Sequence, residues 1–425
     1  MEMYISLALF AATYILMLVF SKYRTYIAIG SGVIFLVTGL LPFGRLADYL
    51  DFNVLLMIIG MMGLVALFIE SRMPVLIADL IMRRVPNVKW AVVALALLAG
   101  IISAFVDNVA TVLMIAPVAV AVCKKLNTNP VPAIIAIAVS SNLQGAATLV
   151  GDTTAIMLGS AMNLSFVDFF WYENRLGMFF AVELGAIVSA VVLFLLFRKE
   201  NGRIPKSDTT TRVNDYVPTV LLLGTIALLV GASFISEKPS ITNGLICCGM
   251  LVIGMVYTLI RNKKFSALLT PVRAIDFQTI GLLFGLFLMI GGITEQGGIS
   301  ATADLIAKIG EGSPLLLYTV IVWGSVLVSA FIDNIPYVAT MIPVIGGIAA
   351  RLGIDPTVLY FGLISGATLG GNCTPIGASA NITAIGILRQ EGYTVKNRDF
   401  FRIGIPFTLA AIIPAYIYLW LVYGV

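Results

Sequence analysis

The chain contains no histidine, and only 11% of its 425 residues are charged. Without imidazole groups, a proton-coupled mechanism has to titrate carboxylates. The four cysteines are too irregularly spaced for a zinc site or a disulfide framework. The sequence has no nucleotide-binding motif, nucleophile–base pair or metal-ligand set, which argues against an enzyme. It also begins without a basic region or a cleavage site, so we expect residues 4–20 to be a retained span and not a signal peptide.

Hydrophobic residues make up 60% of the chain, and the mean hydropathy is +1.02. A soluble protein of this length would need more charge on its surface, and a membrane β-barrel would alternate apolar and polar residues in short segments. We therefore predict an all-α polytopic protein of the plasma or inner membrane, surrounded by lipid. The net charge of +4 is no sign of nucleic-acid binding, because the basic residues follow membrane topology.

Apolar runs long enough to cross a bilayer alternate with two kinds of interruption in the first half. The run 90–122 is broken by Asp107-Asn108 into two short arms, which is typical of a re-entrant hairpin. Glycines and hydroxyl residues interrupt the span 130–162. The remaining elements are spans near 4–20, 25–42, 53–69 and 176–197, with an amphipathic piece at 75–84.

The second half repeats this order. The segment Ser103–Pro117 (SAFVDNVATVLMIAP) recurs 226 residues later as Ser329–Pro343 (SAFIDNIPYVATMIP). We predict a first repeat at 1–198, a cytoplasmic linker at 199–216 and a second repeat at 217–425. The expected elements are spans near 217–235, 241–260, 277–293 and 403–424, an amphipathic piece at 299–309, a hairpin at 315–350 and an interrupted span at 356–388.

The basic residues predict the orientation of the repeats. If each half has five crossings and each hairpin returns to its own side, 21 of the 26 Lys and Arg residues face one side. That side is cytoplasmic by the positive-inside rule, which places both termini outside the cytoplasm. An odd number of crossings inverts the second repeat, as in alternating-access transporters. The five basic residues on the other side are Arg45, Arg175, Lys238, Lys308 and Arg351.

The Asp-Asn pairs form the first group of candidate site residues. A carboxylate beside a carboxamide at membrane depth is costly unless it lines a cavity or binds something. Asp107 and Asp333 have two open interpretations, as N-caps of the returning helices or as ligands. We favour ligand or ion contact for Asn108 and Asn334 over bridging between helices, because both lie at repeat-related breaks. Thr111, one turn further on, joins this set.

The interrupted spans supply the second group. Unpaired backbone groups are tolerated in a bilayer where they line a cavity or coordinate an ion, and freed carbonyls suit Na⁺. The alternative is helix packing through small residues. The candidates combine glycines with hydroxyl and carboxamide residues: Asn142, Gly145, Thr148, Gly151, Gly371, Asn372, Thr374, Gly377, Ser379 and Asn381.

Two carboxylates have no counterpart in the other half. Asp152 aligns with Ala378, and Glu183 lies in an apolar span opposite Ala410. An asymmetric carboxylate suits a coupling proton or cation, because a buried carboxyl group can exchange one for the other. A neutral, hydrogen-bonded Glu183 is the competing interpretation. We predict Asp152 as the coupling residue, with Glu183 next.

These motifs carry a family resemblance. The paired Asp-Asn hairpins, GAATLVGDTT and GATLGGNCTPIGASAN resemble the ion transporter superfamily, in the branch of arsenical-pump permeases, the P protein and Na⁺/H⁺ antiporters. More distantly, the hairpin tips are similar to those of Na⁺-coupled dicarboxylate carriers. The resemblance implies a homodimer with a scaffold and a moving transport domain. It also implies possible Na⁺ sites near Asn108 and Gly151 and near Asn334 and Gly377. Where the branch usually reads Gly-Asp-Pro-Pro-Asn, this chain has Gly151-Asp152-Thr153-Thr154-Ala155.

We therefore expect a secondary active transporter with alternating access, of elevator type, that moves a small inorganic ion or an oxyanion such as arsenite or antimonite. Coupling to H⁺ or Na⁺ is expected, without any other cofactor. An ATP-driven permease would need a separate ATPase partner. The alternative within transport is a Na⁺-coupled carboxylate carrier. An ion channel is less favoured, because channels arrange identical pore loops around an axis whereas inverted repeats favour a carrier.

Overall fold

A computed structural model of the chain describes all residues except 127, 201, 203–210, 311, 312 and 425. Half of the predicted linker at 199–216 therefore lies outside the described residues. The helices of the first half are α1 (Glu2–Val19), α2 (Arg24–Val37), α3 (Leu46–Tyr49), α4 (Phe52–Glu70), α5 (Met73–Met82), α6 (Val88–Ser103), α7 (Asn108–Lys125), α8 (Val131–Gln144), α9 (Thr153–Ala161) and α10 (Met178–Leu196).

The second half follows the same order. Its helices are α11 (Val217–Ser233), α12 (Thr242–Asn262), α13 (Leu269–Ala274), α14 (Phe277–Glu295), α15 (Gly298–Gly310), α16 (Pro314–Ser329), α17 (Asn334–Leu352), α18 (Thr357–Gly370), α19 (Ser379–Gln390) and α20 (Asn397–Tyr423). Short 3₁₀ turns occupy Ser21–Tyr23, Phe43–Arg45, Val167–Phe169, Phe265–Leu268 and Gly371–Cys373.

The prediction of an all-α membrane protein is confirmed. Among the described residues, the only strands are β1 (Trp171–Tyr172) and β2 (Arg175–Leu176), which pair antiparallel just before α10. Within the same residues, eight helices are long and apolar enough to cross a membrane: α1, α4, α7, α10, α12, α14, α17 and α20. Length and composition thus include α7 and α17 among the candidate spans, although we predict that these helices are the returning arms of the two hairpins.

The helices pack reciprocally between the two halves. Helix α2 packs against α14 and α4 against α12, so each pair combines one helix from each half. Within each half, the outgoing hairpin arm packs on the first part of the interrupted span, as α6 on α8 and α16 on α18. The returning arms cross over, α7 to α19 and α17 to α9. The two hairpins therefore meet between the interrupted spans.

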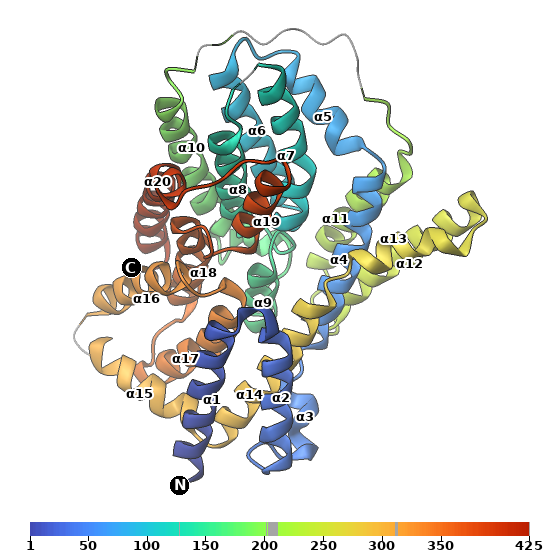
Figure 1. Cartoon of the computed structure of the whole chain (residues 1–425). Coiled ribbons are helices and arrows are strands. Elements are labelled where there is room, and N and C mark those ends of the chain that lie inside the picture. Colours follow the sequence, from blue (N-terminus) through green and yellow to red (C-terminus); the bar gives the residue numbers. More distant parts are fainter. Residues whose placement is uncertain (127, 201, 203–210, 311–312, 425) are drawn as a thin grey trace.

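Two groups of helices follow from this packing (Figure 1). The scaffold group comprises α1–α4 and α11–α14. The hairpin group comprises α6–α10 and α16–α20. Helices α5 and α15, the predicted amphipathic pieces, connect the groups, since each follows a scaffold helix and packs on a hairpin helix. The candidate site lies where the tips of the hairpins face the scaffold group.

Candidate functional site

The two hairpin tips are capped by their aspartates. The Oδ2 of Asp107 accepts hydrogen bonds from the backbone N–H groups of Val109 (3.0 Å) and Ala110 (3.2 Å) at the start of α7. The Oδ1 of Asp333 accepts one from Ile335 (3.2 Å) at the start of α17. The capping interpretation is therefore confirmed. A cap fixes the helix start and leaves the other carboxylate oxygen available for further contacts.

The two interrupted spans are held on the hairpins by equivalent hydroxyl groups. In the first break, Thr148 donates its hydroxyl to the carbonyl of Ala104, at the end of α6. In the second, Thr374 donates to Ala330, at the end of α16. The two threonine donors are 226 positions apart, and so are the two alanine acceptors. The duplicated sequence therefore produces the same docking contact in both halves.

Glycine is required at two positions of close backbone approach. A Cβ atom added at Gly151 would lie 2.6 Å from the carbonyl oxygen of Gly145 and 2.9 Å from that of Ser103. One added at Gly377 would lie 2.7 Å from the oxygen of Gly371 and 2.8 Å from that of Ala330. Carbonyl oxygens thus converge on each break, and they are the kind of donor that Na⁺ prefers at an unwound helix. The backbone at both positions fits the predicted ion sites in donor type.

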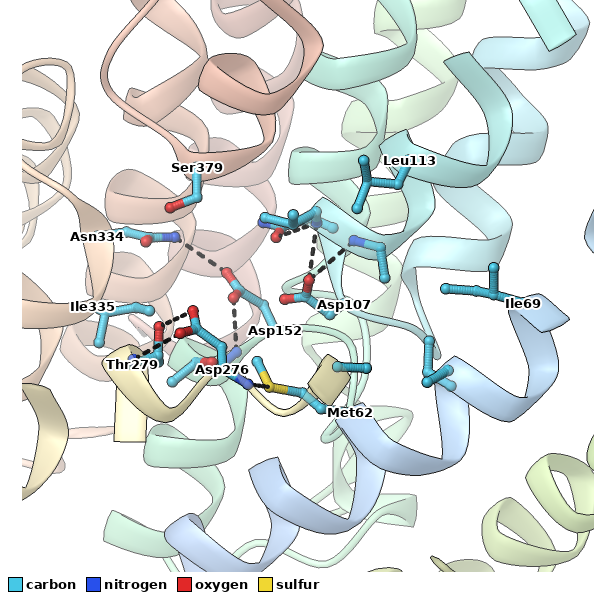
Figure 2. A pocket seen from close by; sticks show the side chains of 17 residues that line it. Met62, Ile69, Asp107, Leu113, Asp152, Asp276, Thr279, Asn334, Ile335 and Ser379 are labelled. Atoms are coloured by element: carbon cyan, nitrogen blue, oxygen red, sulfur yellow. Dashed lines mark hydrogen bonds between the residues drawn. The ribbon is translucent and has the colours of Figure 1, made fainter. Parts of the chain in front are cut away.

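A cavity of about 230 Å³ opens between the hairpin tips and the scaffold group. Figure 2 shows Asp152 near its centre, with Asp107 on one side and Asn334 on the other. Its wall on the scaffold side comes from α4 and from the start of α14. The predicted site residues that line it are Asp107, Asn108, Asp152, Asn334 and Ser379.

Asp152 joins the two halves of the chain. It caps α9 by accepting from the backbone N–H of Thr153 (2.7 Å), and its Oδ2 accepts from the hydroxyl of Thr154 (3.1 Å). The same oxygen accepts from the Nδ2 of Asn334 (3.1 Å), at the tip of the other hairpin. Asp152 is only 4% exposed. This carboxylate therefore contacts the second hairpin tip directly.

Asn108 belongs to a buried chain of carboxamides that extends away from the cavity. Its Nδ2 donates to Asn142 (2.9 Å), which in turn donates to the carbonyl of Thr368 (2.7 Å) and to Asn372 (3.1 Å). Asn372 donates to the carbonyl of Val139 (2.9 Å). Asn142 and Asn372 are fully buried. They connect α8 to the second interrupted span and hold the carboxamide of Asn108 in place.

Other predicted residues lie outside the cavity lining. Thr111 is fully buried and donates to the carbonyl of Val106 (3.5 Å). The Nδ2 of Asn381 donates to the carbonyls of Gly371 and Thr374, both at 3.0 Å, which closes the second break. Glu183, half-buried on α10, lies close to Gln144 and is not among the described residues that line the cavity.

Sequence reasoning did not assign three polar residues of the cavity. Asp276 caps α14 by accepting from the N–H of Gln278 (3.0 Å), and it also accepts the hydroxyl of Thr279 (2.7 Å). Asp276 and Thr279 line the cavity together with Thr153. The sequence signal was the recurrence of Asp51-Phe52 as Asp276-Phe277, which marked the repeat without indicating a site.

The electrostatic character of the cavity is acidic. Three carboxylates, those of Asp107, Asp152 and Asp276, line it, whereas none of its described lining residues is Lys or Arg. Among the described residues, no group of three acidic, Cys or His side chains is close enough to hold a metal ion by itself. The carboxylates are therefore spread around the cavity, where each can meet a proton or a small cation.

This fold and this site define a membrane transporter. A model of the citrate transporter (CitMHS) family matches residues 14–258 and 234–425, and the chain belongs to this family. It is 32% identical over 387 residues to an uncharacterized transporter of Mycobacterium bovis, a match that covers 88% of this chain and 87% of the relative. The predicted resemblance to the ion transporter superfamily is confirmed.

Two further comparisons concern a less similar relative and a solved structure. It is 28% identical over 442 residues to the human P protein, a match that covers 85% of this chain and 52% of that protein. The fold is similar to that of the YdaH transporter of Alcanivorax borkumensis, with a TM-score of 0.61 and 15% identity, over 89% of this chain and 88% of the other. At that identity, the likeness concerns the fold alone.

Proposed function

We propose that the chain is a secondary active transporter in which Asp107 and Asp152 exchange H⁺ or Na⁺ while the cavity carries a small inorganic ion or oxyacid such as arsenite or antimonite. The main observation in support is that three carboxylates line the cavity and that none of its described lining residues is Lys or Arg. Arsenite and antimonite are uncharged hydroxides near neutral pH, so they need no cationic side chain. Hydroxyl and carboxamide groups of the tips suit such a ligand, and exchange against H⁺ makes the transporter an antiporter for arsenite efflux.

The transport motion is of elevator type. The scaffold wall of the cavity is formed largely by apolar side chains of α4, namely Met62, Val65, Ala66 and Ile69. A smooth apolar wall allows the hairpin group to slide without breaking many hydrogen bonds. Two of the lining residues, Leu113 on α7 and Asp276 at the start of α14, are exposed at the surface of the chain. Under the predicted topology, α4 ends on the basic side, and this conformation is open to the cytoplasm.

A second candidate is a cation-coupled carboxylate carrier, favoured by the family's description as citrate transporters. A polycarboxylate would bring negative charge to three aspartates, so it requires accompanying cations. The N-termini of α7, α9, α17 and α19, which begin at the tips and breaks, supply amide groups toward an anion. The two candidates therefore differ in the direction of the coupling cation. The carboxylate carrier moves its substrate and the cation in the same direction, whereas the antiporter moves them in opposite directions.

Counterflow in proteoliposomes tests the proposal. Vesicles containing the purified protein are loaded with one compound, and exchange is followed for arsenite, antimonite, Na⁺, chloride and citrate, with and without Na⁺ or Mg²⁺. Saturable arsenite or antimonite exchange driven by an imposed pH or Na⁺ gradient is expected. Citrate movement that requires a cation on the same side establishes the carboxylate carrier instead. Flux that does not saturate and shows no counterflow contradicts any carrier and indicates a channel.

A further inference from the structure

The two hairpin tips face different surroundings although their sequences correspond. Asp107 lines the acidic cavity, and hydrogen bonds from described residues reach only its Oδ2. Asp333 is absent from that lining, whereas its neighbour Asn334 is present. Asp333 instead lines a second cavity, of about 220 Å³, between α1 and the start of α17. The second tip thus presents its carboxamide to one cavity and its carboxylate to another.

Arg24 provides the counter-charge for Asp333. Its Nη1 donates to the Oδ2 of Asp333 at 2.5 Å, and the two side chains are 31% and 13% exposed. A hydrogen bond between opposite charges is stronger than one between neutral groups, and a carboxylate so little exposed needs such a partner. Ser379 adds a weaker hydrogen bond to the same oxygen, at 3.3 Å. The first tip has no equivalent, because the stretch of α12 around Met250, 226 positions after Arg24, contains no basic residue.

The Arg24–Asp333 pair joins helices that the proposed motion would separate. Arg24 begins α2 in the scaffold group, whereas Asp333 is the tip of a hairpin. The other ion pairs of the described residues stay within one group or lie between a connecting helix and its neighbour. Displacement of the hairpin group therefore removes Arg24 from the tip and leaves Asp333 in need of another positive charge.

We propose that Arg24 is a tethered cation that occupies the second hairpin tip in this conformation and competes there with a mobile cation. The consequence of this inference for transport rests on the proposed function. In this conformation, mobile cations bind at Asp107 and Asp152, and Arg24 displaces any cation carried at Asp333. The second cavity is lined mostly by apolar side chains, so Asp333 is the group that would attract a cation into it. Removal of the guanidinium leaves space for a small ion beside the carboxylate.

The test measures the Tm of the purified protein as guanidinium, a substitute for the arginine side chain, is added at low millimolar concentration. Choline chloride at equal ionic strength is the salt control. Arg24→Ala should be destabilised, and guanidinium should raise its Tm along a saturation curve. The wild type and Arg24→Lys should show no such response. Arg24→Ala/Asp333→Asn should also lose it, because no charge remains at the tip. Arg351→Ala, which breaks the ion pair with Asp304 at the other end of α17, is the matched control.

An equal response in the wild type, or its persistence in the double variant, overturns the proposal, as does a folded Arg24→Ala protein that guanidinium leaves unchanged. If Arg24→Ala cannot be purified in folded form, the double variant should still fold, since it lacks the uncompensated charge. Failure of both to fold also counts against the proposal. None of these readouts requires transport. A wild type that moves no substrate therefore refutes the proposed function alone.

Discussion

The two interrupted spans have nearly the same backbone and differ in the side chains at the start of the second half-helix. In the first break, Asp152 caps α9, and Ala155 lies three residues later. In the second, Ala378 precedes α19 without a side-chain cap, and Asn381 lies three residues later. At these differing positions, Asp152 of the first break lines the shared cavity. Asn381 of the second break instead donates hydrogen bonds to two carbonyls of its own loop.

The difference separates a responsive half from a structural half. Asp152 is bound by Asn334 from the other hairpin, so its charge state affects groups in both halves. Asn381 is fully buried and holds two carbonyls of its own break. Its Oδ1 has no hydrogen-bond partner among the described residues. The duplicated backbone is therefore the same in both breaks, and the residues at two positions give the breaks different hydrogen-bond partners.

The largest effect is expected where the two breaks are alike. Gly151→Ala and Gly377→Ala each place a Cβ within 2.9 Å of two or more backbone oxygens, which cannot move aside like a flexible side chain. Each substitution should cost at least about 1–3 kcal/mol of stability and abolish transport. Thermal unfolding of the purified variants measures the loss. Gly386→Ala in α19, where an added Cβ meets nothing within 4 Å, is the control and should be neutral or stabilising. Wild-type stability in both break variants would contradict the close approach.

The second prediction tests the responsive half. Asp152→Asn keeps the size of the side chain but removes the group that exchanges a proton or a cation. Accumulation driven by an imposed pH gradient should be lost, while substrate exchange without a gradient should remain largely intact. Both are measured in proteoliposomes. Asp355→Asn is the matched control, because Asp355 accepts a hydrogen bond from the backbone of Thr357 at the start of α18 and is not in the cavity lining, so pH-driven accumulation should be retained.

Two results would assign coupling elsewhere. If Asp152→Asn still concentrates substrate when a pH difference is imposed, Asp152 is not the coupling residue. Glu183 is then tested in the same way as Glu183→Gln. If transport of the wild type follows Na⁺ at constant pH, the coupling ion is Na⁺, and the carboxylate-carrier candidate gains support.

The positions of the tips and breaks followed from the sequence because polar residues in long apolar runs are rare and occurred twice. That pattern identified Asp107, Asn108 and Asn334, whereas Asp152 was identified because it has no counterpart in the other half. The fold brings all four to one cavity. Helix capping was one of the two interpretations that the sequence left open for the tip aspartates. Local chemistry sufficed in these cases, since a helix break at membrane depth has few explanations.

Arg24 and Asp276 were not recognised as site residues, for a physical reason. Each lies at the end of an apolar run, where a charged residue is already explained by topology or by helix capping. Their roles depend on which helices pack together across the two halves, and no local pattern reports that. The sequence also gave no sign that Asp333 faces away from the cavity that Asn334 lines.

The third prediction compares the two tip asparagines. Asn108→Ala and Asn334→Ala should each weaken the affinity for an uncharged oxyacid about twofold to tenfold, because a neutral hydrogen bond contributes about 0.5–1.5 kcal/mol. For a charged substrate the loss should be tenfold to a hundredfold, because a hydrogen bond to a charged group contributes about 1.5–3 kcal/mol. Asn334→Ala alone should also change the dependence on the coupling ion, since it removes the donor to Asp152. Concentration dependence of exchange measures both effects. Asn243→Ala, a buried asparagine of α12 outside the cavity lining, is the control. Unchanged affinity in both tip variants would return the asparagines to a structural role.

The smallest effect is expected at Ser379, the first residue of α19. Its hydroxyl reaches Asp333 at 3.3 Å, a long bond beside the much shorter one from Arg24. Ser379→Ala should therefore change exchange kinetics less than about threefold, since a neutral hydrogen bond contributes only about 0.5–1.5 kcal/mol and this one is near the limit of length. The same substitution in the Arg24→Ala background should have a larger effect, because the hydroxyl is then the remaining side-chain donor to that carboxylate among the described residues. Additive effects in the double variant would show that Ser379 and Arg24 act on Asp333 independently. A loss of tenfold or more in Ser379→Ala alone would instead make this hydroxyl a direct ligand of the transported ion. The second break would then be as responsive as the first.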